Sequence, residues 1–157
     1  MQIAKNVLEE RAVSEVKYYG AYDPYKRDVV RLDSCGGWIG TPSDLTAFFV
    51  RIDGFKDTEQ LLSDKALRVM TTPSAVNPRY AKGLFIDPRR VTDSRRDNWW
   101  HTGLLDGAST LSVRTSGDFC WSAFTNTGSS NPDLTRPLGH LVWEMVRSVA
   151  DWHPESA

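Results

Sequence analysis

The chain has 157 residues and a mass of 17.7 kDa, which is the size of one domain. It is 40% hydrophobic and 25% charged, which excludes a disordered or fibrous chain and predicts a globular fold with its own core. The net charge of −1 excludes a global attraction to nucleic acid or to an anionic membrane surface. The sequence holds no run of about 18 apolar residues, so no membrane-spanning helix is expected. Met1 is not followed by an apolar leader, so no secretory signal is visible, and the compartment stays open.

The cysteines and histidines give no pattern of a disulfide framework or a metal site. Cys35 and Cys120 lie far apart and neither belongs to a Cys-x-x-Cys motif. His101, His140 and His153 share no ligand spacing. We therefore expect two buried free thiols, no bound metal and no cofactor.

Residues 1–40 are expected to be extended and rich in loops. The pattern indicates a short strand over residues 16–19, and residues 20–40 hold many turn-forming residues. A compact domain rarely carries so long a structureless excursion, so this stretch is expected to lean on another part of the molecule.

A first short helix is predicted from Thr41. Thr41 is the N-cap, Pro42 occupies the first turn and Asp44 completes a capping box. Gly54 is expected to end the helix. Its apolar stripe consists of Leu45, Phe48, Phe49 and Ile52.

A second short helix is predicted to follow, so that residues 41–73 form a pair of helices. Ser63 is the N-cap, and Leu62 and Leu67 have the spacing of a hydrophobic staple. Pro73 ends the helix. Its further apolar positions are Val69 and Met70.

Residues 80–126 predict an antiparallel sheet of about four strands. The Ser116-Gly117-Asp118 turn is short enough to join two of them as a hairpin, and Asp87-Pro88 and Asp106-Gly107 are the other breaks. The apolar or alternating runs are Tyr80 to Ile86, Trp99 to Gly103, Leu111 to Thr115 and Phe119 to Phe124.

Residues 132–152 predict a long C-terminal helix on one face of that sheet, with Pro137 in its first turn. The expected fold is α+β, in one domain over residues 1–157, with the two short helices before the sheet. The predicted apolar face of the last helix consists of Leu134, Leu138, Leu141, Met145, Val149 and Trp152.

Several stretches, taken in order, resemble the serine β-lactamase and penicillin-binding-protein superfamily, in its class C and esterase-like branch. The resemblance covers about residues 15–152 and implies the C-terminal half of that fold. The matching stretches are Gly36-Gly37-Trp38-Ile39-Gly40-Thr41-Pro42-Ser43-Asp44-Leu45, Leu61 to Met70, Asn98-Trp99-Trp100-His101-Thr102-Gly103, Gly107-Ala108-Ser109-Thr110-Leu111, Trp121 to Asn126 and the last helix.

The resemblance assigns the family's third motif, Lys/His-Thr-Gly, to residues 101–103. It implies that His101 is a cation or a proton-relay residue, that Thr102 supplies a hydrogen-bonding hydroxyl, and that Gly103 permits close approach. Leu104 would donate its backbone N–H to an oxyanion hole. Without the resemblance, a histidine on a strand beside two tryptophans is more typical of a structural residue.

The tryptophans give a further set of candidates. Trp99 and Trp100 point to opposite faces of their strand, so one of them is expected to line a substrate site. Six tryptophans are also compatible with a carbohydrate-binding surface, but the other four lie in apolar patterns that favour the core. These four are Trp38, Trp121, Trp143 and Trp152.

The family's nucleophile motif, Ser-x-x-Lys, has no convincing counterpart. Ser14-Glu15-Val16-Lys17 matches it literally, but about half a match is expected by chance in a chain with fourteen Ser and six Lys. No apolar helical run follows Ser14 to bury a nucleophile. Ser129-Ser130-Asn131 matches the second motif but comes after the third, and no Tyr-x-Asn occurs. Both matches are interpreted as coincidences.

Two hypotheses follow. In the first, the chain is part of a serine hydrolase that cleaves small amide or ester substrates through an acyl-enzyme, and it is inactive alone. In the second, it is a non-catalytic module that binds a ligand or partner. In both, an open strand edge and an apolar face predict self-association or a partner chain that completes the sheet.

A basic loop over residues 88–96 lies beside Trp99 and Trp100. Basic and aromatic neighbours could bind single-stranded nucleic acid. Asp93 and Asp97 interrupt the positive charge, so a solvated turn is the favoured interpretation and no nucleic-acid partner is expected.

Overall fold

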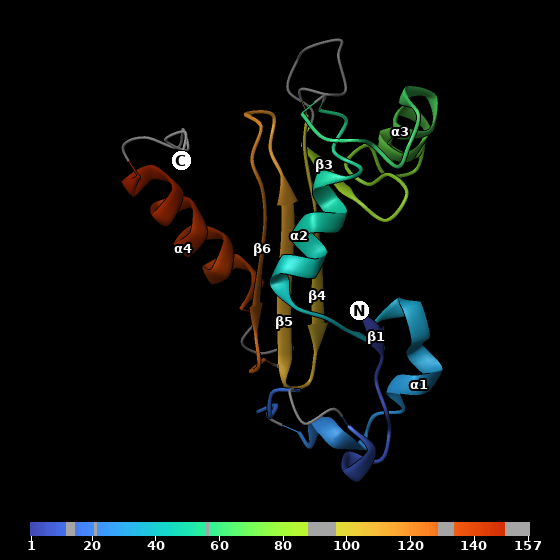
Figure 1. Cartoon of the computed structure of the whole chain (residues 1–157), viewed down its shortest axis with the longest axis vertical. Coiled ribbons are helices and arrows are strands. Elements are labelled where there is room, and N and C mark those ends of the chain that lie inside the picture. Colours follow the sequence, from blue (N-terminus) through green and yellow to red (C-terminus); the bar gives the residue numbers. More distant parts are fainter. Residues whose placement is uncertain (12–14, 21, 56, 88–96, 129–133, 150–157) are drawn as a thin grey trace.

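The computed structural model describes residues 1–11, 15–20, 22–55, 57–87, 97–128 and 134–149, and it has an α+β fold (Figure 1). Within these residues it contains four α-helices, a four-stranded antiparallel sheet and a separate two-stranded sheet. The predicted fold class and the predicted sheet of about four strands are therefore confirmed.

The four strands follow one another along the chain and across the sheet. Their order is β3-β4-β5-β6, and every neighbouring pair is antiparallel. Gly107, with φ of 83°, lies in the turn between β4 and β5, and Asp118, with φ of 66°, lies in the predicted hairpin between β5 and β6. The strands are β3 (Phe85–Asp87), β4 (Asn98–Leu105), β5 (Ala108–Arg114) and β6 (Cys120–Thr125).

The predicted strand over residues 80–86 is wrong in extent. Only Phe85 and Ile86 of that run belong to β3, and Tyr80 makes an isolated antiparallel bridge to Phe85. The chain turns back between these residues, since the Ala81 N–H donates to the Leu84 carbonyl at 2.8 Å and Gly83 has φ of 78°.

Helices α2 (Pro42–Val50) and α4 (Thr135–Ser148) pack on opposite faces of the sheet. On one face Trp99 of β4 meets Phe49 of α2, with ring centroids 5.4 Å apart. On the other, Gly139 of α4 lies so close to Leu111 that a Cβ there would stand 3.2 Å from the leucine side chain. Residues on the two faces alternate along each strand, so α2 and α4 sandwich the sheet.

Helix α2 begins as the sequence predicts. Asp44 donates its N–H to the Thr41 hydroxyl at 3.1 Å and accepts the Thr41 N–H at 2.9 Å, which completes the capping box. The helix ends at Val50, before Gly54, which forms the next turn with φ of 79°. The predicted stripe is correct for Phe49 and for Ile52, which is buried just after the helix, and wrong for Phe48, which is 46% exposed.

Helix α3 (Asp64–Thr71) has the predicted N-cap, since the Ser63 hydroxyl accepts the Ala66 N–H at 3.3 Å. It ends before Pro73 because the preceding residue takes an extended backbone. Leu67 is buried as predicted, whereas Val69 is exposed and does not join the core.

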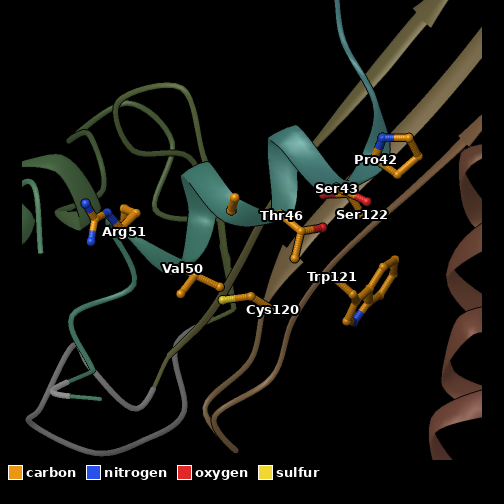
Figure 2. A pocket seen from close by; sticks show the side chains of 9 residues that line it. Pro42, Ser43, Thr46, Val50, Arg51, Cys120, Trp121 and Ser122 are labelled. Carbon is orange, nitrogen blue, oxygen red and sulfur yellow. The ribbon is translucent and has the colours of Figure 1, made fainter. Parts of the chain in front are cut away.

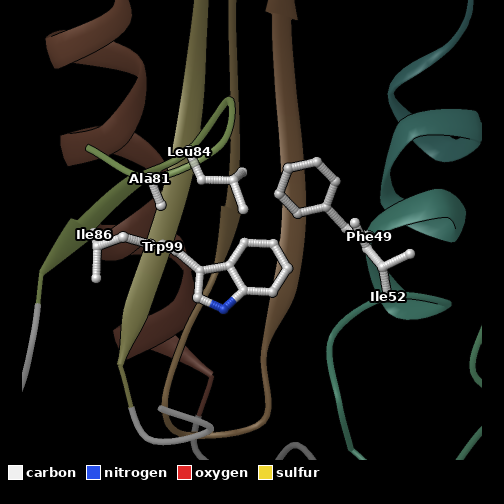
Figure 3. Close-up of a cluster of buried hydrophobic side chains, with 6 residues drawn as sticks. All are labelled: Phe49, Ile52, Ala81, Leu84, Ile86 and Trp99. Atoms are coloured by element: carbon white, nitrogen blue, oxygen red, sulfur yellow. The ribbon is translucent and has the colours of Figure 1, made fainter. Parts of the chain in front are cut away.

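The core lies between α2, α3 and the upper part of the sheet (Figure 3). Trp99 is 1% exposed and is its largest apolar side chain. The buried cluster consists of Phe49, Ile52, Ala81, Leu84, Ile86 and Trp99.

Arg114, at the end of β5, is fully buried beside this core. Its Nε donates to the Asp53 carbonyl at 3.1 Å and its Nη1 to the Asp97 carbonyl at 2.9 Å. The guanidinium also lies over the ring of Phe55, 4.0 Å from the centroid, and 5.6 Å from that of Trp99. Carbonyl oxygens and aromatic faces thus solvate a charge that water does not reach.

Helix α4 differs from its prediction in the face that it buries. The predicted apolar stripe is wrong at Leu141, Met145 and Val149, which are 54%, 59% and 40% exposed. The half-buried Val142 and Trp143 face the sheet instead, and the ring of Trp143 meets Trp121 of β6 edge-on at 6.4 Å. Gly139 explains the choice, because its missing side chain lets this side of the helix approach Leu111 most closely. Trp152 and the predicted helical residues at both ends lie outside the described residues.

Residues 1–40 hold more structure than predicted. Strands β1 (Gln2–Ile3) and β2 (Trp38–Ile39) pair with each other, and the segment between them contains α1 (Val29–Leu32) and short 3₁₀ turns. Two predictions of burial are wrong here. Trp38 is exposed and donates its indole N–H to Asp33 at 2.7 Å, and Cys35 is exposed, although both cysteines are free.

This first segment leans on the lower end of the sheet, as the length of the excursion predicts. Tyr19 forms a parallel bridge with Thr127. The predicted strand over residues 16–19 is thus reduced to one bridging residue. Arg27 donates to the Asp106 carboxylate at 3.2 Å, which ties the segment to the turn between β4 and β5.

Candidate functional site on strand β4

The predicted third motif lies on β4, on the part of the strand that β3 does not cover. Strand β3 pairs with β4 only along residues 98–100. Residues 101–105 pair with β5 on one side, and no other described strand pairs with their outer side.

Hydrogen-bond alternation shows which backbone groups face this open edge. The Thr115 N–H donates to the Phe119 carbonyl at 2.8 Å, and bonded pairs recur at every second residue of an antiparallel ladder. Counting along the two registers, His101 and Gly103 bond to β5, so that Thr102 and Leu104 turn their N–H and C=O groups outward. The backbone donor that the resemblance implies at Leu104 therefore faces the open edge.

His101 lies on the α2 face of the sheet. Its ring stacks on Phe85, with centroids 6.3 Å apart and planes 22° apart, and part of the side chain remains exposed. Burial by its neighbours lowers the pKa of His101 from its ordinary value of 6.5. A neutral imidazole is therefore favoured at neutral pH, which suits a proton relay better than a permanent cation.

A row of hydroxyls continues from His101 across the sheet. Register places Ser112 opposite His101, and Ser122 opposite Ser112. The two serine hydroxyls lie 2.9 Å apart and hydrogen bond to each other. Ser112 is buried, so its hydroxyl is not an open nucleophile.

Gly103 is the close-approach position of the motif. A Cβ at this residue would collide with the Thr110 hydroxyl on the neighbouring strand. The glycine thus keeps the α2 face of β4 flat just below His101.

The side chains of the two tryptophans before the motif lie on opposite faces of the sheet, as the alternation along a strand predicts. Trp99 points into the core and has no surface for a ligand, so the candidate for substrate contact narrows to Trp100. Trp100 is half-buried and stacks on Phe85, with centroids 5.7 Å apart and planes 18° apart. Phe85 thereby links Trp100 and His101, a contact that the sequence pattern does not reveal.

The other motifs singled out in the sequence lie outside the described residues. These are Ser14 of the Ser-x-x-Lys match, Ser129-Ser130-Asn131, and the basic loop from Pro88 to Arg96. No group of three or more His, Cys, Asp or Glu among residues with a described position could hold a metal ion. In the same part of the chain, no helix has the length and apolar character needed to cross a membrane.

A groove of about 650 Å³ lies at the opposite edge of the sheet, between α2 and β6 (Figure 2). It is mostly apolar and does not include His101, which is two strands away. Sequence reasoning did not find it, because it depends on where α2 crosses the sheet. Its lining consists of Pro42, Ser43, Thr46, Ala47, Val50, Arg51, Cys120, Trp121 and Ser122.

Comparison with known proteins identifies no relative: no family model, no curated protein and no solved structure matches the chain.

Proposed function

We propose that the chain is a domain of a β-lactamase-related serine hydrolase, and that it carries the wall of the active site on β4. In such an enzyme an amide or ester substrate would be cleaved through an acyl-serine. The observation that carries the proposal is the outward backbone of Thr102 and Leu104, beside His101, on an edge that no described strand covers.

This geometry suits the binding of an acyl group. The Leu104 N–H is a fixed donor for an oxygen that gains negative charge in the transition state. His101 lies three residues before Leu104 on the same strand, and its lowered pKa supports a role in holding or passing a proton. Trp100 stacks with Phe85 on the face of β4 opposite His101, and this pair would hold an apolar substrate group that reaches around the open edge.

A second candidate is a non-catalytic module that keeps this wall and binds a ligand. Its support is the chemistry beside His101, where Ser112 is buried and the two serines of the row satisfy each other. With Ser14 interpreted as a coincidental match, we expect no robust turnover from the chain alone.

The two candidates are separated by measuring turnover and binding on the same preparations. We expect a chromogenic β-lactam and an activated ester to bind without turnover, and His101→Ala to weaken that binding about tenfold. His140→Ala, which changes an exposed histidine on α4, is the matched control and should leave binding unchanged.

Turnover that Ser14→Ala abolishes would make Ser14 the nucleophile and establish the hydrolase in this chain. Binding without turnover that depends on His101 supports β4 as a substrate wall under either candidate. Absence of both binding and turnover would contradict any role of β4 as a substrate wall.

The sheet geometry also supports an association partner. Strand edges that are left open invite pairing with another strand. We propose that the chain self-associates or receives a partner chain, independently of whether it catalyses a reaction.

A further inference from the structure

The outer edge of β6 presents a regular row of unpaired backbone groups. Counting again from the Thr115–Phe119 bond, Cys120, Ser122 and Phe124 turn their N–H and C=O groups away from β5. Tyr19 confirms this alternation. It lies on the side of the chain away from β5, where its N–H donates to the Asn126 carbonyl at 2.9 Å and its carbonyl accepts the Gly128 N–H at 3.2 Å. Tyr19 thus covers the chain below β6, and no described strand covers β6 itself.

Nothing in β6 protects this edge from another strand. Its sequence, Cys-Trp-Ser-Ala-Phe-Thr, has no charge, proline or glycine, which are the usual protections of an exposed edge. Arg51 is the one charged residue that lines the adjacent groove, and it pairs with Glu59 at 3.4 Å. Two identical copies of this edge can therefore meet without bringing like charges together.

We infer that two copies of the chain associate through β6 to form one continuous eight-stranded sheet. The outward-facing residues are spaced symmetrically about Ser122, so a two-fold axis at Ser122 pairs Ser122 with its counterpart and Cys120 with Phe124 of the second copy. All three outward-facing residues of each strand then exchange both of their hydrogen bonds. Tyr19 limits the register, because it already occupies the edge from Asn126 onward.

The groove between α2 and β6 gives the second copy a place for a side chain. Cys120, Ser122 and Phe124 all lie on the α2 face, where Ser122 bonds to Ser112. In the proposed register, Phe124 of the second copy stands opposite Cys120, beside Val50 (Figure 2). An apolar ring thus enters an apolar groove.

The contact is large enough for a dimer. A six-residue strand is about 20 Å long, and the three layers of α2, sheet and α4 are together about 30 Å thick, so the edge offers about 600 Å² of each copy. A standard interface buries about 800 Å² on each side, and filling the groove makes up much of the difference. Leu141 and Met145 are also exposed, on α4, which diverges from the sheet beyond β6 (Figure 1).

Sedimentation velocity over a range of concentrations, extending to high micromolar, tests the dimer directly. We expect a monomer–dimer equilibrium in which Ser122→Pro raises the dissociation constant about tenfold or more. Proline has no N–H, so the variant loses the two hydrogen bonds that the Ser122 N–H groups of the two copies donate across the axis. Ser122→Ala is the matched control, since it keeps that N–H and removes only the hydroxyl. A single monomeric species at high concentration overturns the inference, as does a Ser122→Pro variant that dimerises like the original chain.

Cysteine trapping tests the register even if Ser122→Pro fails to fold. A chain carrying Cys35→Ser, Cys120→Ser and Ser122→Cys has one thiol at the proposed axis, where facing Cα atoms would be about 5.5 Å apart and within reach of a disulfide. It should form a covalent dimer on mild oxidation. The control carries only Cys120→Ser and so keeps the exposed Cys35, and it should not. Equal cross-linking of both chains overturns the register. None of these readouts involves substrate, so they stand apart from the test of the hydrolase.

Discussion

Arg114 connects several segments in the upper half of the molecule. Its guanidinium joins the loop after α2, the start of β4 and the end of β5 through two carbonyl oxygens. The planar group also lies on Phe55, which a lysine ammonium could not match. Burial lowers the pKa of Arg114 from its ordinary value, while the carboxylates of Asp53 and Asp97 oppose that shift and help to keep the charge.

Replacing Arg114 should therefore be costly. We expect Arg114→Ala to lower the free energy of unfolding by about 3–5 kcal/mol, because it leaves buried carbonyls unpaired and a cavity between rings. Arg114→Lys should recover part of that loss. Urea unfolding measures both, with the exposed Arg68→Ala as control, which should change stability by less than about 0.5 kcal/mol. A loss at Arg114 no larger than the control would contradict the structure.

His101 makes stability depend on pH in a definite direction. Its pKa is lower in the folded chain than the ordinary 6.5, so the unfolded chain binds more protons in that range. Stability is then complete above pH 6.5 and falls as the pH drops from 6.5 toward the folded pKa. We expect His101→Gln to flatten this part of the profile, as measured by urea unfolding at a series of pH values. A profile that keeps the full slope in the variant would contradict this assignment.

Features of helices and strands that depend on residues close together in the sequence could be predicted, and features that depend on distant contacts could not. The start of α2 follows from Thr41 and Asp44, which lie within one turn of each other, so the sequence alone specifies it. The buried face of α4 does not follow from its own residues, because Leu141 and Val142 are both apolar. Gly139 against Leu111 decides between them, and that contact joins residues far apart in sequence. The length of β3 likewise depends on the turn at Gly83.

The two sides of α4 can be told apart by substitution. We expect Val142→Asp to destabilise the fold by about 2 kcal/mol, since it places a charge against the sheet. Leu141→Asp, its neighbour on the exposed side, should cost less than about 0.5 kcal/mol when measured at low protein concentration. Thermal or urea unfolding of the pair provides the comparison. Equal losses would mean that both sides of the helix are buried.

For the whole molecule, an antiparallel sheet of about four strands was predictable, but which stretches of its two edges are open was not. Alternating residues and the Ser116-Gly117-Asp118 turn indicate a run of antiparallel strands, and this places residues 101–103 on a strand. The open edge beside Leu104 exists because β3 stops opposite Trp100. The groove at β6 exists because α2 crosses there. Both features depend on how elements end and cross, which periodicity does not encode.

The attachment of the first segment to the far end of the sheet has a consequence for synthesis. The Asn126 side chain bonds to the Lys17 carbonyl across 109 residues of chain. At ordinary rates of translation, Asn126 is made roughly 5 to 20 s after Lys17. Throughout that interval Lys17 and Tyr19 lack their partners at the end of β6, whereas Arg27 can already reach Asp106 of the earlier β4–β5 turn. The strands β4 to β6 pair with sequence neighbours and can form as soon as they emerge.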